Sequence, residues 1–309
     1  ASTIATIRLN LAVLAQSRGD IAKTIAHLEA AIDMGERAGK RATVQQARAN
    51  LANLEIRLGR HARARASIDA LSKEGDALPK VAQAQLLGLR AFLAARTGAT
   101  DEACQLFDAC GDAYEALGRG LDAAEAWLEG IALAARSPSA DVGILSAKLD
   151  RAQRALGDTA AHRALRLLAE GSVVALRDQW SLARAHFDEA LEAAKQGGQK
   201  EWIFRALETR AHFATEAGQL FAARKDAEQA LVVLEEMAAE LPRDLREVFW
   251  DDPLRKRLRE RVLGATITFE PPTPRPRQDD RLARILEINR KLAREHDLDR
   301  LVEQITDHA

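Results

Sequence analysis

A small residue recurs about every 40 positions along most of the chain. It stands at six places, with successive steps of 40, 39, 39, 41 and 40: Ala12, Ala52, Ala91, Gly130, Gly171 and Ala211. Seven residues after each comes a turn position, filled by Gly19, Gly59, Gly98, Ser137, Asp178 and Gly218. Four of these six are Gly, which readily adopts the left-handed conformation that ends a helix. A fixed period of about 40 residues, with a helix, a tight turn and a second helix in each unit, predicts an α-solenoid.

The residues after each turn repeat a second pattern. In the stretch QWSLARAHFDEAL, residues 179–191, three residues stand at steps of four and three and share one helix face: Ala183, Phe187 and Ala190. The matching trios are Thr24/Leu28/Ala31, Ala64/Ile68/Leu71, Ala103/Phe107/Cys110, Val142/Ser146/Leu149 and Ala223/Ala227/Ala230. Small residue, turn glycine and trio together resemble the tetratricopeptide repeat in a long-helix form. The third and fifth units fit that family pattern well, whereas the fourth keeps only its spacing.

The resemblance implies an all-α fold, an α-α superhelix of about six helical hairpins over residues 1–240. Composition favours the same class, because Ala, the best helix former, supplies much of the apolar content and aromatic residues make up only 4%. Residues 241–263 carry an apolar stripe and are predicted to form a capping helix over the last repeat. Their basic run, residues 255–261, is interpreted as a solvated helix face, with contact to phosphate as the less favoured alternative.

Residues 264–278, GATITFEPPTPRPRQ, break the helical pattern and predict a stiff, extended linker. Residues 279–309 then form an amphipathic pattern. The words ILEINRKL and DLDRLVEQI resemble the signalling helix and first helix of a GAF domain, here truncated. In similar bacterial regulators this order precedes a sigma-54-type activator or follows a Ser/Thr kinase domain. The alternative is a generic dimerising helix, which would make a homodimer through residues 279–309.

Charge and cysteine content restrict the partners and the compartment. The formal net charge is −1, from 45 basic and 46 acidic residues, so no overall basic field attracts the chain to nucleic acid or to a membrane. Cys104 and Cys110 are interpreted as two reduced thiols, and a cytoplasmic location is expected. The chain begins at Ala1 and stops at Ala309 inside helical patterns, from which we expect an excised fragment of a longer protein.

No catalytic pattern is present in the sequence. The seven His are scattered singly, and there is no HExxH pair, no Gly-rich phosphate loop and no GxSxG elbow. We therefore predict that this chain is not an enzyme and uses no metal or cofactor.

The first helices of the repeats are expected to line a concave inner surface, which is where such arrays bind their partners. The positions predicted to face it are Gln46, Asn53, Arg57, Gln85, Phe92, Arg96, Trp127, Arg205, Glu208 and His212. Asn and Arg side chains there can hold a peptide backbone or a carboxylate by hydrogen bonds. The family's carboxylate-clamp pattern is not reproduced intact, and Trp127 has a role in the core as its alternative.

Three functions fit these patterns. The first is an interaction and sensor module of a bacterial signalling or transcription regulator, with a protein or peptide in the groove. The second is a structural spacer that dimerises through its last helix. The third is a regulatory solenoid that binds a small effector, which would require a closed apolar pocket.

Overall fold

The computed structural model describes residues 2–157, 159, 162–198 and 200–263. This part of the chain contains fourteen α-helices, one short 3₁₀ turn (Gly75–Ala77) and no strand. The first helices of the hairpins are α1 (Ser2–Ser17), α3 (Arg41–Leu58), α5 (Lys80–Thr97), α7 (Gly120–Ala134), α9 (Arg163–Ala175) and α11 (Lys200–Glu216). The second helices are α2 (Ile21–Arg37), α4 (His61–Ser72), α6 (Thr100–Ala116), α8 (Val142–Leu156), α10 (Trp180–Gln196) and α12 (Leu220–Ala239). Two further helices follow, α13 (Arg243–Asp251) and α14 (Pro253–Leu263).

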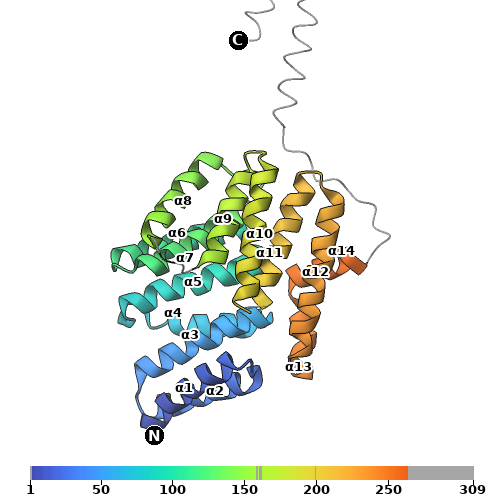
Figure 1. The fold of residues 1–309 in the computed structure, drawn as a ribbon. Coiled ribbons are helices and arrows are strands. Elements are labelled where there is room, and N and C mark those ends of the chain that lie inside the picture. The colour runs from blue at the N-terminus through green and yellow to red at the C-terminus, as the bar shows by residue number, and fades with distance from the viewer. Residues whose placement is uncertain (1, 158, 160–161, 199, 264–309) are drawn as a thin grey trace, which may run out of the picture. The chain divides into compact units, whose positions relative to one another are not determined.

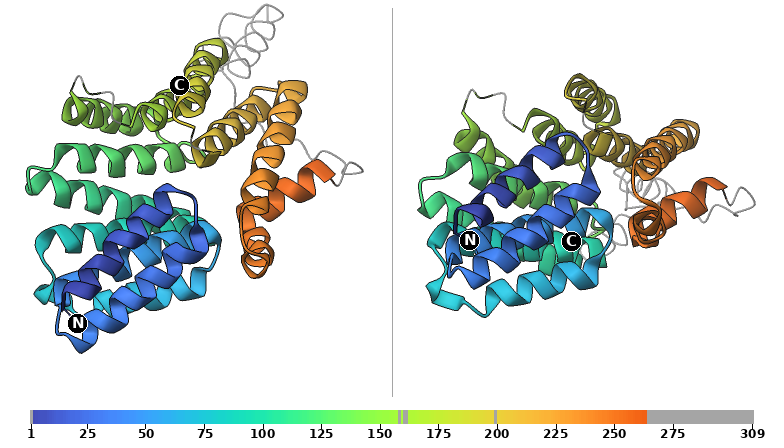
Figure 2. Two further views of the ribbon diagram at one scale, coloured as in Figure 1. Left: turned by 60° about the horizontal axis from the view of Figure 1, so that its bottom comes forward. Right: turned by 90° about the horizontal axis from the view of Figure 1, so that it is seen from below.

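Successive helices pack against one another as six hairpins, from α1–α2 to α11–α12 (Figures 1 and 2). All six small residues that define the 40-residue period are buried. The predicted all-α solenoid with six helical hairpins is therefore confirmed.

Small residues are required where large side chains of a neighbouring helix press on a backbone. A Cβ atom added to Gly171 would lie 2.6 Å from Cε1 of Phe187, and one added to Gly130 would lie 3.1 Å from Cβ of Phe107. Both phenylalanines are central members of the predicted trios, and both are buried. The repeat thus pairs a small residue on one helix with a large apolar residue on a neighbouring helix, which lets the helices approach closely.

The turn positions show why glycine dominates them. Gly59 and Gly98 end α3 and α5 in the left-handed conformation, with φ of 82° and 87°. Asp178 adopts φ of 59° at the same place in the fifth repeat, a conformation that Asp tolerates better than most residues. The residue types at the predicted turns therefore match the positive φ angles that the backbone adopts there.

The fourth hairpin departs from the predicted register. Its second helix, α8, buries Leu145, Leu149, Ala152 and Leu156. The predicted trio of Val142, Ser146 and Leu149 shares only Leu149 with this face, and α9 packs more extensively on α7 than on α8. This unit keeps the helical pair and the spacing but not the side-chain pattern.

Residues 243–263 form two helices in place of the single capping helix that was expected. Asp252 separates α13 from α14 in an extended conformation (φ −56°, ψ 126°), and Pro253 lacks the N–H group that would continue α13. We call residues 243–263 the strap. It packs on α12 (Figures 1 and 2) and also contacts α3 and α5.

The predicted linker over residues 264–278 and the amphipathic, GAF-like helix over residues 279–309 lie outside the described residues.

Candidate partner-binding surface

Four side chains of α3 share its inner face at steps of four, three and four. They are Gln46, Asn50, Asn53 and Arg57. All but Asn50 are exposed, and Nε2 of Gln46 donates a hydrogen bond of 2.9 Å to Oδ1 of Asn50. The inner face of α3 therefore presents a solvent-accessible row of side-chain amides, followed by one guanidinium group.

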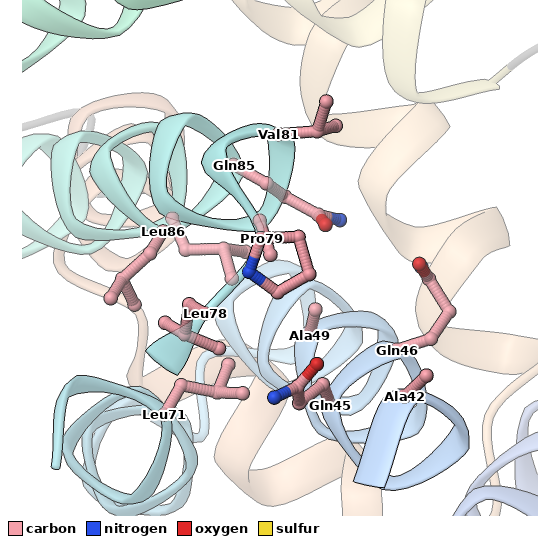
Figure 3. Close-up of a pocket in the computed structure, with 12 residues that line it drawn as sticks. Ala42, Gln45, Gln46, Ala49, Leu71, Leu78, Pro79, Val81, Gln85 and Leu86 are labelled. Carbon is pink, nitrogen blue, oxygen red and sulfur yellow. The ribbon is translucent and has the colours of Figure 1, made fainter. Parts of the chain in front are cut away.

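A pocket of about 210 Å³ lies between α3 and α5 beside this row (Figure 3). Its apolar lining is Ala42, Ala49, Leu71, Leu78, Pro79, Val81, Ala82, Leu86 and Leu89, and its polar lining is Gln45, Gln46 and Gln85. In Figure 3, Gln46 and Gln85 lie on the same side of Pro79. Gln45 is held in place because its amide donates a hydrogen bond of 2.7 Å to Glu74. The structure thus brings the predicted residues Gln46 and Gln85 together at one apolar pocket.

Two aromatic residues among the predicted inner positions have packing roles. Phe92 is half-buried, with its ring edge-on to Phe107 at a centroid distance of 5.0 Å. Trp127 is only 2% exposed, and the guanidinium of Arg151 covers its ring at 4.0 Å. Trp127 is therefore a core residue, the alternative that the sequence left open.

The inner face of α11 is occupied by ion pairs with the chain itself. Arg205 donates hydrogen bonds of 2.7 and 2.6 Å to the carboxylate of Glu129 on α7. Glu208 accepts two hydrogen bonds from Arg136, directly after α7, one of them at 2.8 Å. Glu129 and Glu208 are buried, whereas both arginines are half-buried. These two bidentate pairs fasten α11 to α7.

A third ion pair joins α11 to α5. Arg96 Nη2 lies 3.0 Å from Glu201 Oε1. Burial opposes ionisation of Glu201 and Glu208, but the paired arginines outweigh it and hold the pKa of both carboxyls below its ordinary value. His212, the next residue on the same face of α11, contacts the ring of Phe213 and lies 3.5 Å from Glu216.

The strap adds a buried acid to this region. Asp252 is 1% exposed and accepts hydrogen bonds from the backbone N–H groups of Leu254 and Arg255 at 3.1 and 3.2 Å. Its second oxygen lies 3.5 Å from His61 Nε2 and 3.9 Å from Arg96 Nη1. Burial alone would raise the pKa of Asp252, but these neighbours lower it to about 2.

Arg255 is fully buried, which corrects the interpretation of residues 255–261 as a solvated face. Its guanidinium donates hydrogen bonds to the carbonyls of Phe249, at 3.1 Å, and Arg57, at 2.5 Å, and lies 3.7 Å from the Phe249 ring centroid. These carbonyls belong to the last turns of α13 and α3, where intrahelical partners are missing and a cation is favoured. Arg255 therefore caps two helices, while the rest of the basic run is exposed except for the buried Leu258.

From the sequence, Arg96, Arg205, Glu208 and His212 were predicted to face inward, but their partners were not predicted. Glu201, Arg205, Glu208 and His212 follow α11 at steps of four, three and four. This continuous stripe of charged side chains was the available signal for internal pairing. Asp252 and Arg255 carried no such signal, because they sit in a segment dense in charge.

Within the described residues there is no group of three or more His, Cys, Asp or Glu side chains that could hold a metal ion. None of the described helices is both long and apolar enough to cross a membrane.

Comparison with known proteins gives one kind of match. No protein-family model matches the chain, and no curated protein matches it. Among solved structures, the chain is similar to a tetratricopeptide repeat protein from Parabacteroides merdae, with 13% sequence identity over 97% of each chain and a TM-score of 0.35. Because that score is low, the fold assignment rests on the helices and turns described above.

Proposed function

We propose that the chain is a protein-interaction scaffold that binds an extended peptide segment of another protein along α3 and α5. The observation that carries the proposal is the pocket between these helices, where the amides of Gln46 and Gln85 lie beside an apolar lining. A glutamine amide both donates and accepts hydrogen bonds, so it complements the N–H and C=O groups of a peptide backbone. An apolar side chain of the same peptide would occupy the pocket.

The size of the pocket supports a peptide over a small effector. At about 210 Å³ it lies below the roughly 300–1,000 Å³ of small-molecule sites, so it suits a single side chain. Asn53 and Arg57 continue the polar row along α3 beyond the pocket and would contact further peptide groups. This arrangement supports binding over catalysis as the role of the chain.

Selection of peptides displayed on phage against the full chain tests the proposal. The enriched peptides are expected to share an apolar residue. Their Kd should rise roughly tenfold or more when Gln46 and Gln85 are both replaced by Ala, because losing partners of buried polar groups costs about 1–3 kcal/mol. Gln105→Ala, at an exposed glutamine on α6, is the matched control and should leave Kd unchanged. Peptides that bind all three proteins equally would overturn the proposal.

The regulatory setting is a separate proposal. We propose a cytoplasmic signalling or transcription regulator that dimerises through residues 279–309. The free thiols of Cys104 and Cys110 fit a reducing compartment, and burial raises the pKa of Cys110 to about 12, which keeps it unreactive. Sedimentation of the full chain and of residues 1–278 tests the dimer: a dimer that becomes a monomer supports it, and equal association states of the two proteins contradict it.

A further inference from the structure

Polar residues of the strap contact the C-terminal ends of α3 and α5. Asp252 faces His61 and Arg96, and Arg255 caps the end of α3 through the Arg57 carbonyl. The strap shares no lining residue with the pocket between α3 and α5. It therefore occupies a different part of the inner face, the part that holds Arg96.

The burial of Arg255 carries a cost that reduces the net contribution of these contacts. Arg255 is buried as a cation beside Arg96, and burial together with that neighbour lowers its pKa to about 10. Its Nε atom has no hydrogen-bond partner among the described residues. Removing such charges from water offsets much of the attraction between them, so polar contacts of this kind add less stability than an apolar interface would.

The strap helices depend on the array for their structure. α13 has nine residues and α14 has eleven, which is below the roughly 12–15 residues at which an isolated helix persists in water. Leu245, Phe249 and Leu258 are buried in the main core and hold the strap while it is docked. Once released, the strap would lose its helices as a unit.

We propose that the strap is a releasable cover, an autoinhibitory contact that withholds Arg96 and His61 from partners while it is docked. Release leaves Arg96 and His61 without the carboxylate of Asp252. The uncovered surface then suits a segment that brings a carboxylate of its own. The six hairpins stay folded during this release.

Two glycines of the same type provide a matched test. Gly59 and Gly98 both end a first helix with positive φ, so an Ala at either place carries the same backbone strain. A Cβ at Gly59 would lie 2.9 Å from the Val248 carbonyl oxygen on the strap, whereas a Cβ at Gly98 would meet nothing within 4 Å. The difference between the two variants therefore isolates the docking of the strap.

Hydrogen exchange followed by mass spectrometry should be measured on the full-length wild type, Gly59→Ala and Gly98→Ala. We expect wild-type amides of α13 and α14 to exchange faster than those of α11 and α12. Gly59→Ala should accelerate strap exchange at least tenfold over Gly98→Ala, with α11 and α12 alike in both variants. If the strap amides of the wild type exchange no faster than those of α11 and α12, the proposal is overturned. This outcome does not depend on whether the variants fold.

Discussion

Gln46 and Arg205 occupy the same place in their repeats, six residues before the small residue of the first helix, yet they have opposite surroundings. Gln46 is exposed at the edge of an open pocket. Arg205 is bound through two hydrogen bonds to Glu129 on another hairpin. The same register thus gives an accessible surface on α3 and an internal contact on α11.

The difference lies in what faces each helix. α11 meets α5 and α7, which present Arg96, Glu129 and the neighbouring Arg136 to its charged stripe. The strap contacts α3 at its C-terminal end, through Arg255 and the Arg57 carbonyl. A repeat position therefore indicates which way a side chain faces, while the opposing helix decides whether that side chain is free to bind a partner.

Breaking a buried pair on α11 should have the largest effect on stability. Glu208→Ala leaves Arg136 without its carboxylate, and removing one partner of a buried ion pair costs about 3–5 kcal/mol. Urea unfolding followed by circular dichroism would measure the loss. Glu235→Ala, at an exposed glutamate on α12, is the control and should change the unfolding free energy by less than about 0.5 kcal/mol. Equal effects of the two changes would contradict the conclusion that the inner face of α11 is occupied by stabilising ion pairs.

Acid should weaken the strap through Asp252. Its pKa in the folded chain is about 2, below the ordinary value of 3.8, so its contribution is present above pH 4 and is lost as the pH falls from 3.8 toward 2. The difference corresponds to about 2 kcal/mol. The lowered pKa values of Glu201 and Glu208 act in the same direction, whereas burial raises the pKa of Glu55, which acts in the opposite direction.

The unfolding free energy, measured from pH 6 to pH 3, should fall less in Asp252→Asn than in the wild type. Identical slopes for the two proteins would show that Asp252 is not stabilised as a carboxylate.

Replacing both partners of a buried pair should be far milder than breaking it. Glu129→Leu alone leaves Arg205 unpaired, whereas adding Arg205→Met should restore the unfolding free energy to within about 1 kcal/mol of the wild type. A double-mutant cycle by urea unfolding measures this recovery. A double variant as unstable as the single one would show that the pair itself, rather than the isolated charge, decides stability.

The smallest effect on stability is expected from the side chains at the pocket between α3 and α5. Gln46→Ala and Gln85→Ala together should change stability by less than about 0.5 kcal/mol each, because neither side chain is fully buried. Thermal unfolding would verify this. A large drop in Tm would mean that the pocket supports the fold instead of remaining available to a peptide.

The fold could be predicted because its determinants are local. Gly171 and Phe187, or Gly59 at its turn, lie within one repeat, and their spacing is visible in the sequence. The fourth unit was the exception, since Val142 and Ser146 keep the period while the apolar face of α8 follows Leu145 and Ala152. In this unit the 40-residue spacing is kept, but the buried side chains do not follow the predicted trio. The packing of α8 is needed to identify its buried face.

The site could be predicted only in part. The register indicated that Arg96, Arg205 and Glu208 face inward, but their partners lie 72 to 105 residues away along the chain. Such pairing depends on how successive hairpins bring α11 against α5 and α7, which no local spacing encodes. Arg255 was misjudged for a related reason, because it lies in a charge-rich run and one of its contacts is the Arg57 carbonyl on α3, 198 residues away along the chain.

Arginine labelling tests most directly whether the inner face of α3 is accessible to solvent while that of α11 is occupied by internal ion pairs. The native wild type would be treated with phenylglyoxal at neutral pH, and modification of each arginine would be followed over time by mass spectrometry. We predict that the exposed Arg57 reacts at least tenfold faster than Arg136, Arg205 and Arg255, and that this difference disappears in urea. Reaction of Arg205 and Arg136 at the rate of Arg57 in the native protein would contradict the account.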